Sequence, residues 1–97
     1  MALSKMARSQ LRSLSHTLKP VVMIGAKGVS AQVLAEFEAA LDHHELVKVQ
    51  IGLGDREQRI AAVRELLAHS GAQLVMEIGK VACFYRHNSA APKLELR

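Results

Sequence analysis

A short apolar segment, followed at once by a glycine-rich loop and a helix start, constrains the fold of this chain more than any other feature. Val21–Ile24 is a continuous apolar run of mostly β-branched residues, which is typical of a strand covered on both faces, so we expect a central strand. The loop Gly25-Ala26-Lys27-Gly28 follows, and Ser30 is a favourable N-cap for a helix that reaches about His44. The order of strand, glycine loop and helix predicts an α/β fold.

The segment before this unit has the pattern of an amphipathic helix. Ser4 is a favourable N-cap, and Pro20 enforces an extended segment, so we expect a helix from Ser4 to about Thr17. Apolar residues recur at spacings of three and four and predict a stripe that faces the core. This stripe consists of Leu3, Ala7, Leu11, Leu14 and Leu18.

The rest of the chain completes an αβαβαββ order. Alternating apolar residues predict a second strand over residues 46–53, with one face less buried. Asp55 and Gln58 resemble a capping box, which begins a third helix that ends towards Gly71. Residues 73–78 and 81–86 then form two strands, joined by a two-residue loop whose glycine suits a type II′ turn. This order predicts one βαβ unit and a hairpin.

Length and composition fit one globular domain. The chain has 97 residues, of which 49% are hydrophobic, so we expect a domain over residues 1–88 and a polar tail over residues 89–97. The apolar runs are much shorter than the roughly 20 residues of a membrane span, and the N-terminus does not resemble a signal peptide. We therefore expect a cytoplasmic protein. Cys83 is the single cysteine, which excludes a disulfide or a thiolate cluster within one chain.

Positive charge is concentrated in the first third of the chain. The formal net charge is +4, yet residues 1–35 contain five lysines and arginines and no acid. Along the first helix the basic residues recur at helical spacing, so they form an outer ridge opposite the apolar stripe. A solvated helix face is the plain alternative. The ridge consists of Lys5, Arg8, Arg12, His16 and Lys19.

The loop Gly25-Ala26-Lys27-Gly28 has the form of a GxxG motif. Two glycines let the backbone turn tightly and come close to another backbone, and the positive end of the following helix favours phosphate. A GxxG loop clamps a nucleic-acid backbone in KH modules, although a plain tight turn also uses two glycines. The spacing matches neither a P-loop nor a dinucleotide-binding loop, so ATP and NAD are not indicated.

Residues that could carry catalysis do not gather anywhere in the sequence. The five histidines form no HxxxH pair, and Cys83 lies in an apolar run, so we expect neither a metal site nor a nucleophile. Only three aromatic residues are present, too few for base stacking of the RRM or OB-fold type. We therefore expect a binding protein without catalytic activity or cofactor.

Four segments in order carry a resemblance to a known family. They are residues 18–28, which read LKPVVMIGAKG, residues 44–49, residues 55–57, and residues 78–80 leading to Tyr85-Arg86. Together they resemble the YhbY family, the stand-alone bacterial form of the CRM domain, named for chloroplast RNA splicing and ribosome maturation. The resemblance implies a four-stranded mixed sheet flanked by helices, similar to the C-terminal domain of bacterial translation initiation factor three.

The same resemblance implies a function in ribosome assembly. It suggests a monomeric RNA-binding protein that associates with precursor ribosomal RNA of the large subunit, in a pre-ribosomal particle. A different reading of the basic helix is a protein-interaction module that docks on a ribosomal protein or another acidic partner. The resemblance assigns RNA contact to Gly25, Ala26, Lys27 and Gly28; the charge pattern adds Lys5, Arg8, Arg12 and Lys19; and Lys48, Lys80 and Arg86 match further family positions.

Overall fold

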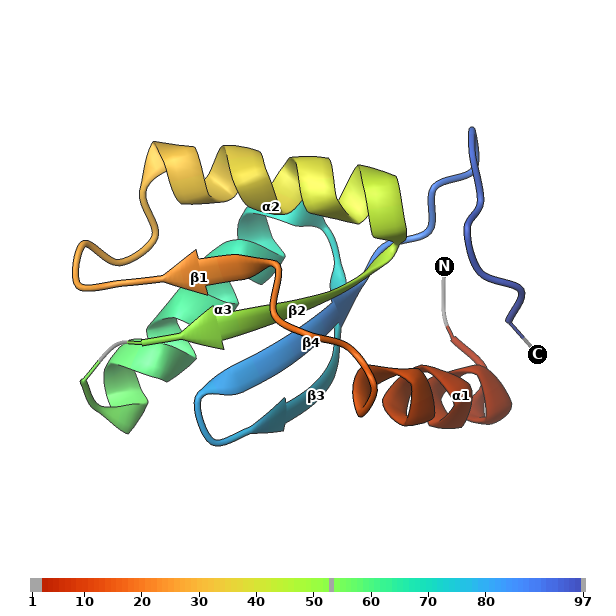
Figure 1. Ribbon diagram of the computed structural model, residues 1–97, viewed down its shortest axis with the longest axis horizontal. Coiled ribbons are helices and arrows are strands. Elements are labelled where there is room, and N and C mark those ends of the chain that lie inside the picture. Colours follow the sequence, from red (N-terminus) through yellow and green to blue (C-terminus); the bar gives the residue numbers. More distant parts are fainter. Residues whose placement is uncertain (1–2, 53, 97) are drawn as a thin grey trace.

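A four-stranded mixed sheet lies between two layers in the computed structural model, which describes residues 3–52 and 54–96 (Figure 1). The strand order is β1-β2-β4-β3, with β1 parallel to β2 and the other neighbours antiparallel. The expected α/β class and αβαβαββ order are confirmed. The elements are α1 (Lys5–Ser15), β1 (Val22–Ile24), α2 (Ala31–His44), β2 (Leu46–Ile51), α3 (Arg56–Ser70), β3 (Gln73–Ile78) and β4 (Val81–Tyr85).

β1 is an edge strand, so the prediction of a central strand over Val21–Ile24 is wrong. Val22 and Ile24 are each 1% exposed, whereas Val21 and Met23 on the other face are 55% and 64% exposed. α2 packs on β1, but α1 packs on β2 and β3 and leaves the second face of β1 open. An apolar run is typical of a strand buried on both faces, but here a helix covers only one face of the strand. β2 is in the middle of the sheet, and its face with Lys48 and Gln50 is less buried than its other face, as expected.

Two separate hydrophobic clusters hold the layers together. α2 and α3 cover one face of the sheet, and their cluster includes Phe37 and Phe84, whose rings meet edge to face with centroids 5.0 Å apart. The other face is covered by α1 and by the segment after β4. As expected, the apolar stripe of α1 faces this second cluster. Its members include Leu11, Leu46, Cys83 and Tyr85, with Leu14, Leu18, Leu94 and Leu96 packed against them.

Local capping places the helix starts where the sequence predicts them. The Ser4 hydroxyl accepts the Ala7 N–H at 3.0 Å, and the Ser30 hydroxyl accepts the Val33 N–H at 3.1 Å. The capping box at the start of α3 is complete. α1, however, ends at Ser15 and not near Thr17, because the last turn tightens into i→i+3 hydrogen bonds before the chain extends towards β1.

The strand ends differ from the expected ones by one or two residues. β2 ends at Ile51, and Leu53, included in the expected strand, lies outside the described residues. β4 ends at Tyr85, one residue before the expected end. Gly79 has φ +57° and Lys80 does not have positive φ, as a type II′ turn requires.

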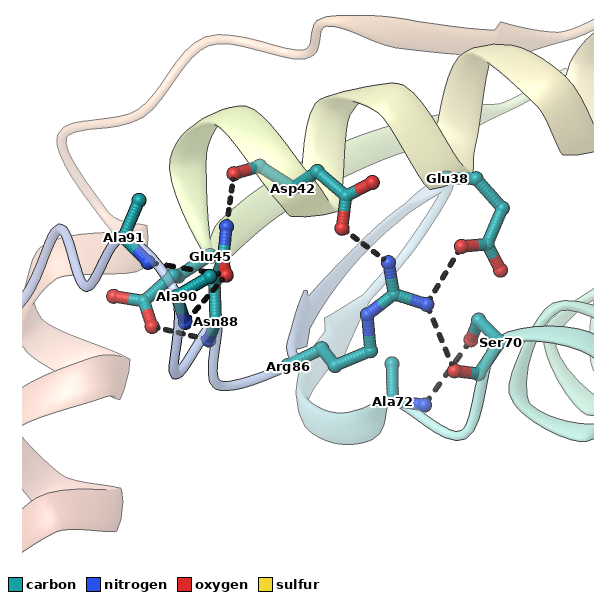
Figure 2. Close-up of polar contacts among 9 residues, drawn as sticks. All are labelled: Glu38, Asp42, Glu45, Ser70, Ala72, Arg86, Asn88, Ala90 and Ala91. Carbon is teal, nitrogen blue, oxygen red and sulfur yellow. Dashed lines mark hydrogen bonds and ion pairs between the residues drawn. The ribbon is translucent and has the colours of Figure 1, made fainter.

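The segment after β4 folds back onto the domain and is held by Glu45, a fully buried residue between α2 and β2 (Figure 2). Its carboxylate accepts the backbone N–H groups of Asn88 and Lys93, both at 2.7 Å, and of Leu94 at 2.9 Å. His87 Nδ1 lies 3.2 Å from it. Residues 89–96 are therefore part of the packed structure, although the sequence suggested only a polar tail.

Candidate nucleic-acid interface

The loop Gly25–Gly28 is an exposed tight turn between β1 and α2. The Gly28 N–H donates to the Gly25 carbonyl at 2.9 Å, and Ala26 and Lys27 form the exposed tip. Gly28 has φ +69°, a conformation that glycine adopts without strain. A Cβ atom placed on Gly25 or Gly28 would have nothing within 4 Å, so open space surrounds both positions. Another backbone can therefore approach this loop directly.

A shallow cavity of about 470 Å³ adjoins the loop and the first turns of α2. The N-terminus of α2 carries the positive end of the helix dipole and favours an anion there. Glu36 also lines the cavity, and its carboxylate accepts a hydrogen bond from the Gln32 amide at 3.3 Å. Because this carboxylate repels phosphate, the tip of the loop, with Lys27, is the most favourable place for one.

The helices on the two faces of the sheet differ in net charge. α1 exposes Lys5, Arg8 and Arg12 and contains no acid, and Lys19 is exposed in the segment that follows it. On the other face, α2 contains three acids and no lysine or arginine, and α3 contains three arginines and two glutamates. These two helices together have more acids than basic residues. A polyanion is therefore attracted to the α1 side. In Figure 1 α1 and the GxxG loop lie towards opposite ends of a molecule 37 Å long.

Two further predicted contacts, Lys48 and Lys80, lie on β2 and in the β3–β4 turn. Lys48 is half-buried on β2 and points to the α1 face, because its neighbours Val47 and Val49 belong to the cluster on the opposite face. Lys80 is exposed in the β3–β4 turn, and its carbonyl accepts the Ile51 N–H at 2.7 Å. β1 and β2 are parallel, so this turn and the GxxG loop are at the same end of the sheet.

The guanidinium of Arg86, another predicted contact, is bound by groups of the protein itself (Figure 2). Its guanidinium donates to Glu38 at 2.7 Å, to Asp42 at 2.8 Å and to the Ser70 carbonyl at 3.0 Å. Burial alone would lower the pKa of Arg86, but its hydrogen bonds to the carboxylates of Glu38 and Asp42, and the negative charges of both, raise this pKa above its ordinary value. The side chain joins α2 to the end of α3, on the acidic side of the molecule.

Two structurally important residues were not identified from the sequence. Glu45 has φ +63°, and its carboxylate is buried. Burial alone would raise its pKa, but the three backbone hydrogen bonds and the nearby His87 lower it below 4.5. Gly52 lies against the end of β1, where its N–H donates to the Ile24 carbonyl at 2.7 Å and a Cβ would meet that oxygen at 3.1 Å. In the sequence, these two residues stand out only as a glutamate just before β2 and a glycine just after it.

Sequence comparison agrees with this geometry. Residues 3–86 match the model of the CRS1/YhbY (CRM) domain. The chain belongs to the CRS1/YhbY (CRM) domain family. CRM relatives occur in several bacteria. A Pseudomonas aeruginosa protein named "probable RNA-binding protein" is 46% identical over 88 residues, which cover 91% of this chain and 85% of the relative. A Haemophilus influenzae RNA-binding protein is 39% identical over 94 residues, which cover 97% and 94%.

A solved CRM-like structure has the same fold. The solution structure of a hypothetical Staphylococcus aureus protein, described as a candidate RNA-binding protein, superposes with a TM-score of 0.82 at 25% identity. The match covers 99% of this chain and 100% of that one. None of the relatives described here is named as an enzyme. Among the described residues, no helix combines the length and apolarity needed to cross a membrane, and no group of acids, histidines or cysteines is placed to hold a metal ion.

Proposed function

We propose that this CRM protein binds structured RNA through its GxxG loop and the α1 side of the sheet, and that it assists assembly of the large ribosomal subunit. The exposed Gly25–Gly28 turn, with open space at both glycines, carries the proposal. The names of the bacterial relatives support RNA as the ligand. The family resemblance to ribosome-maturation proteins supports precursor ribosomal RNA as the target.

In this proposal the RNA is held mainly through its phosphates. Backbone amides of the loop and the N-terminus of α2 bind a phosphate, and Lys27 pairs with it. All three aromatic residues are buried in the core clusters and leave little capacity for base stacking, so sequence specificity is modest. Arg86 is the weakest of the proposed contacts, because two carboxylates already bind its guanidinium. The other contacts run along the sheet and α1: Lys5, Arg8, Arg12, Lys19, Lys48 and Lys80.

Crosslinking in living cells, followed by sequencing of the bound RNA, tests target and site together. The natural protein is compared with the double variant Ala26→Glu and Lys27→Glu. We expect crosslinks on precursor ribosomal RNA of the large subunit, and we expect the loop variant to lose them, because two carboxylates at the tip repel phosphate. The substituted side chains are exposed, so the fold should be retained.

A matched control makes the same change of net charge on α3. Ala68→Glu and Arg64→Glu alter two exposed positions of α3 and should keep the crosslinks. Equal crosslinks in the loop variant and the natural protein would contradict the loop as the RNA site. A partner that stays bound after complete digestion of RNA, with no crosslinks on ribosomal RNA, would instead support an acidic protein partner.

A further inference from the structure

A groove of about 310 Å³ lies where the segment after α1 crosses the start of β2. Most of its lining is aliphatic, with Leu18 and Val21 from the connecting segment and Leu46 from β2. Leu94 completes the lining, and its backbone N–H is held by the buried carboxylate of Glu45 at 2.9 Å. Val21 is 55% exposed, so the groove opens to solvent. Its size is at the lower end of the roughly 300–1,000 Å³ of small-molecule sites.

The charged side chains of the groove are all basic. Lys19 and Lys48 line it together with His44, and no aspartate or glutamate is among its described lining residues. An occupant that complements this lining has an apolar, flat part for the aliphatic side chains and negative charge at its edges for the lysines. A nucleotide has both parts, since the base is apolar on its faces and the flanking phosphates are anionic.

The groove and the proposed RNA-binding loop are joined by the short segment from Val21 to Gly25. Val21 and Gly25 are four residues apart on an extended segment, a span of roughly 13 Å. Between them Met23 is 64% exposed on the same face as Val21 and lines the cavity beside the loop. One RNA strand that follows the open face of β1 therefore reaches both places.

We propose that this groove receives one unpaired nucleobase of the bound RNA, with the phosphates on either side of it at Lys19 and Lys48. This inference rests on the proposed RNA binding and adds a site for a single base within it. The protein then prefers RNA with an extruded nucleotide over regular duplex. Binding through phosphates alone does not distinguish positions along an RNA, whereas an extruded base marks one position.

Two RNA hairpins test the groove directly. They are identical except at a single-nucleotide bulge, which carries either a purine base or an abasic residue, so backbone shape and charge are the same. We expect the natural full-length protein to bind the base-bearing hairpin about fivefold or more tightly, because the apolar faces of the base are buried against aliphatic side chains. Val21→Lys places a long side chain in the groove without removing positive charge, and it should abolish this preference while binding to the abasic hairpin is retained.

Ile78→Lys is the matched control. Ile78 is 59% exposed at the end of β3, similar to Val21, and receives the same change there. This variant should keep the fivefold preference. Equal affinity of the natural protein for the two hairpins, or a preference that survives Val21→Lys, would overturn the base site while RNA binding stands. Failure of the natural protein to bind either hairpin would instead contradict the proposed function itself.

Discussion

At the scale of single residues, Glu45 is the position where we expect the largest effect on stability. Glu45→Gln removes the charge and replaces one acceptor oxygen by a donor that faces backbone N–H groups. We expect a loss of about 1–3 kcal/mol in the free energy of unfolding at pH 7. The pKa of the folded carboxyl is lowered from its ordinary value. The ionised carboxylate therefore stabilises the fold at pH values above its unfolded pKa, and this stabilisation is lost as pH falls through the folded pKa.

Urea unfolding between pH 7 and pH 3 measures this effect. The difference in unfolding free energy between the natural protein and Glu45→Gln should shrink as pH falls. Glu95→Gln makes the same chemical change at an exposed position of the same segment and should have little effect at any pH. A pH-independent difference for Glu45→Gln would contradict the role of its charge.

The two glycines of the loop should respond differently to substitution. Gly28→Ala forces a side chain into φ +69° and should cost about 1 kcal/mol or more in unfolding free energy. Gly25 does not have positive φ, and a Cβ placed on it has no atom within 4 Å. Gly25→Ala should therefore leave the free energy of unfolding unchanged. If RNA backbone approaches the loop closely, Gly25→Ala still weakens RNA binding, which a filter-binding titration would detect. Unchanged affinity would show that the RNA does not come within reach of this Cβ.

At the scale of elements, Arg86 acts as a brace between α2, β4 and the end of α3. Arg86→Met leaves two carboxylates and the Ser70 carbonyl without this donor, so thermal unfolding should show a loss of stability. We expect about 1 kcal/mol, since Asp42 is largely exposed and water screens the pair. RNA affinity should change little, because Arg86 is the weakest of the proposed contacts. Reduced RNA affinity at unchanged stability would instead establish Arg86 as a contact, with Arg64→Met on α3 as the control.

At the scale of the whole molecule, the separation of charge across the sheet should control RNA binding. Replacing the three basic residues of α1 by glutamine should weaken binding and reduce the slope of log K against log salt by up to about three, because fewer counterions are released. The same replacement of the three arginines of α3 changes net charge equally and should leave the slope nearly unchanged. The compared sets are Lys5, Arg8 and Arg12 in α1, and Arg56, Arg59 and Arg64 in α3.

Equal slopes for these two triple variants would show that only net charge matters and that α1 is not the RNA-facing side. Binding measured at four salt concentrations is sufficient for this comparison. Circular dichroism of both variants controls for loss of helix, since glutamine is a good helix former.

The sequence by itself determined the features that depend on near neighbours in the chain. Ser4, Ser30 and Asp55 cap the helices they were expected to cap, because a cap joins atoms three residues apart. The GxxG turn is equally local, since one hydrogen bond from Gly28 to Gly25 closes it. Hydrophobic periodicity likewise placed the strands and helices to within one or two residues.

Only the tertiary structure decided what depends on residues far apart. The place of β1 at the edge follows from where α1 packs, which periodicity within β1 does not encode. Arg86 meets Glu38 across 48 residues, and Glu45 meets Leu94 across 49. These contacts occupy the Arg86 guanidinium and bring Leu94 to the groove. Such pairs form because the layers fold together, so the chemistry of a single side chain does not predict them.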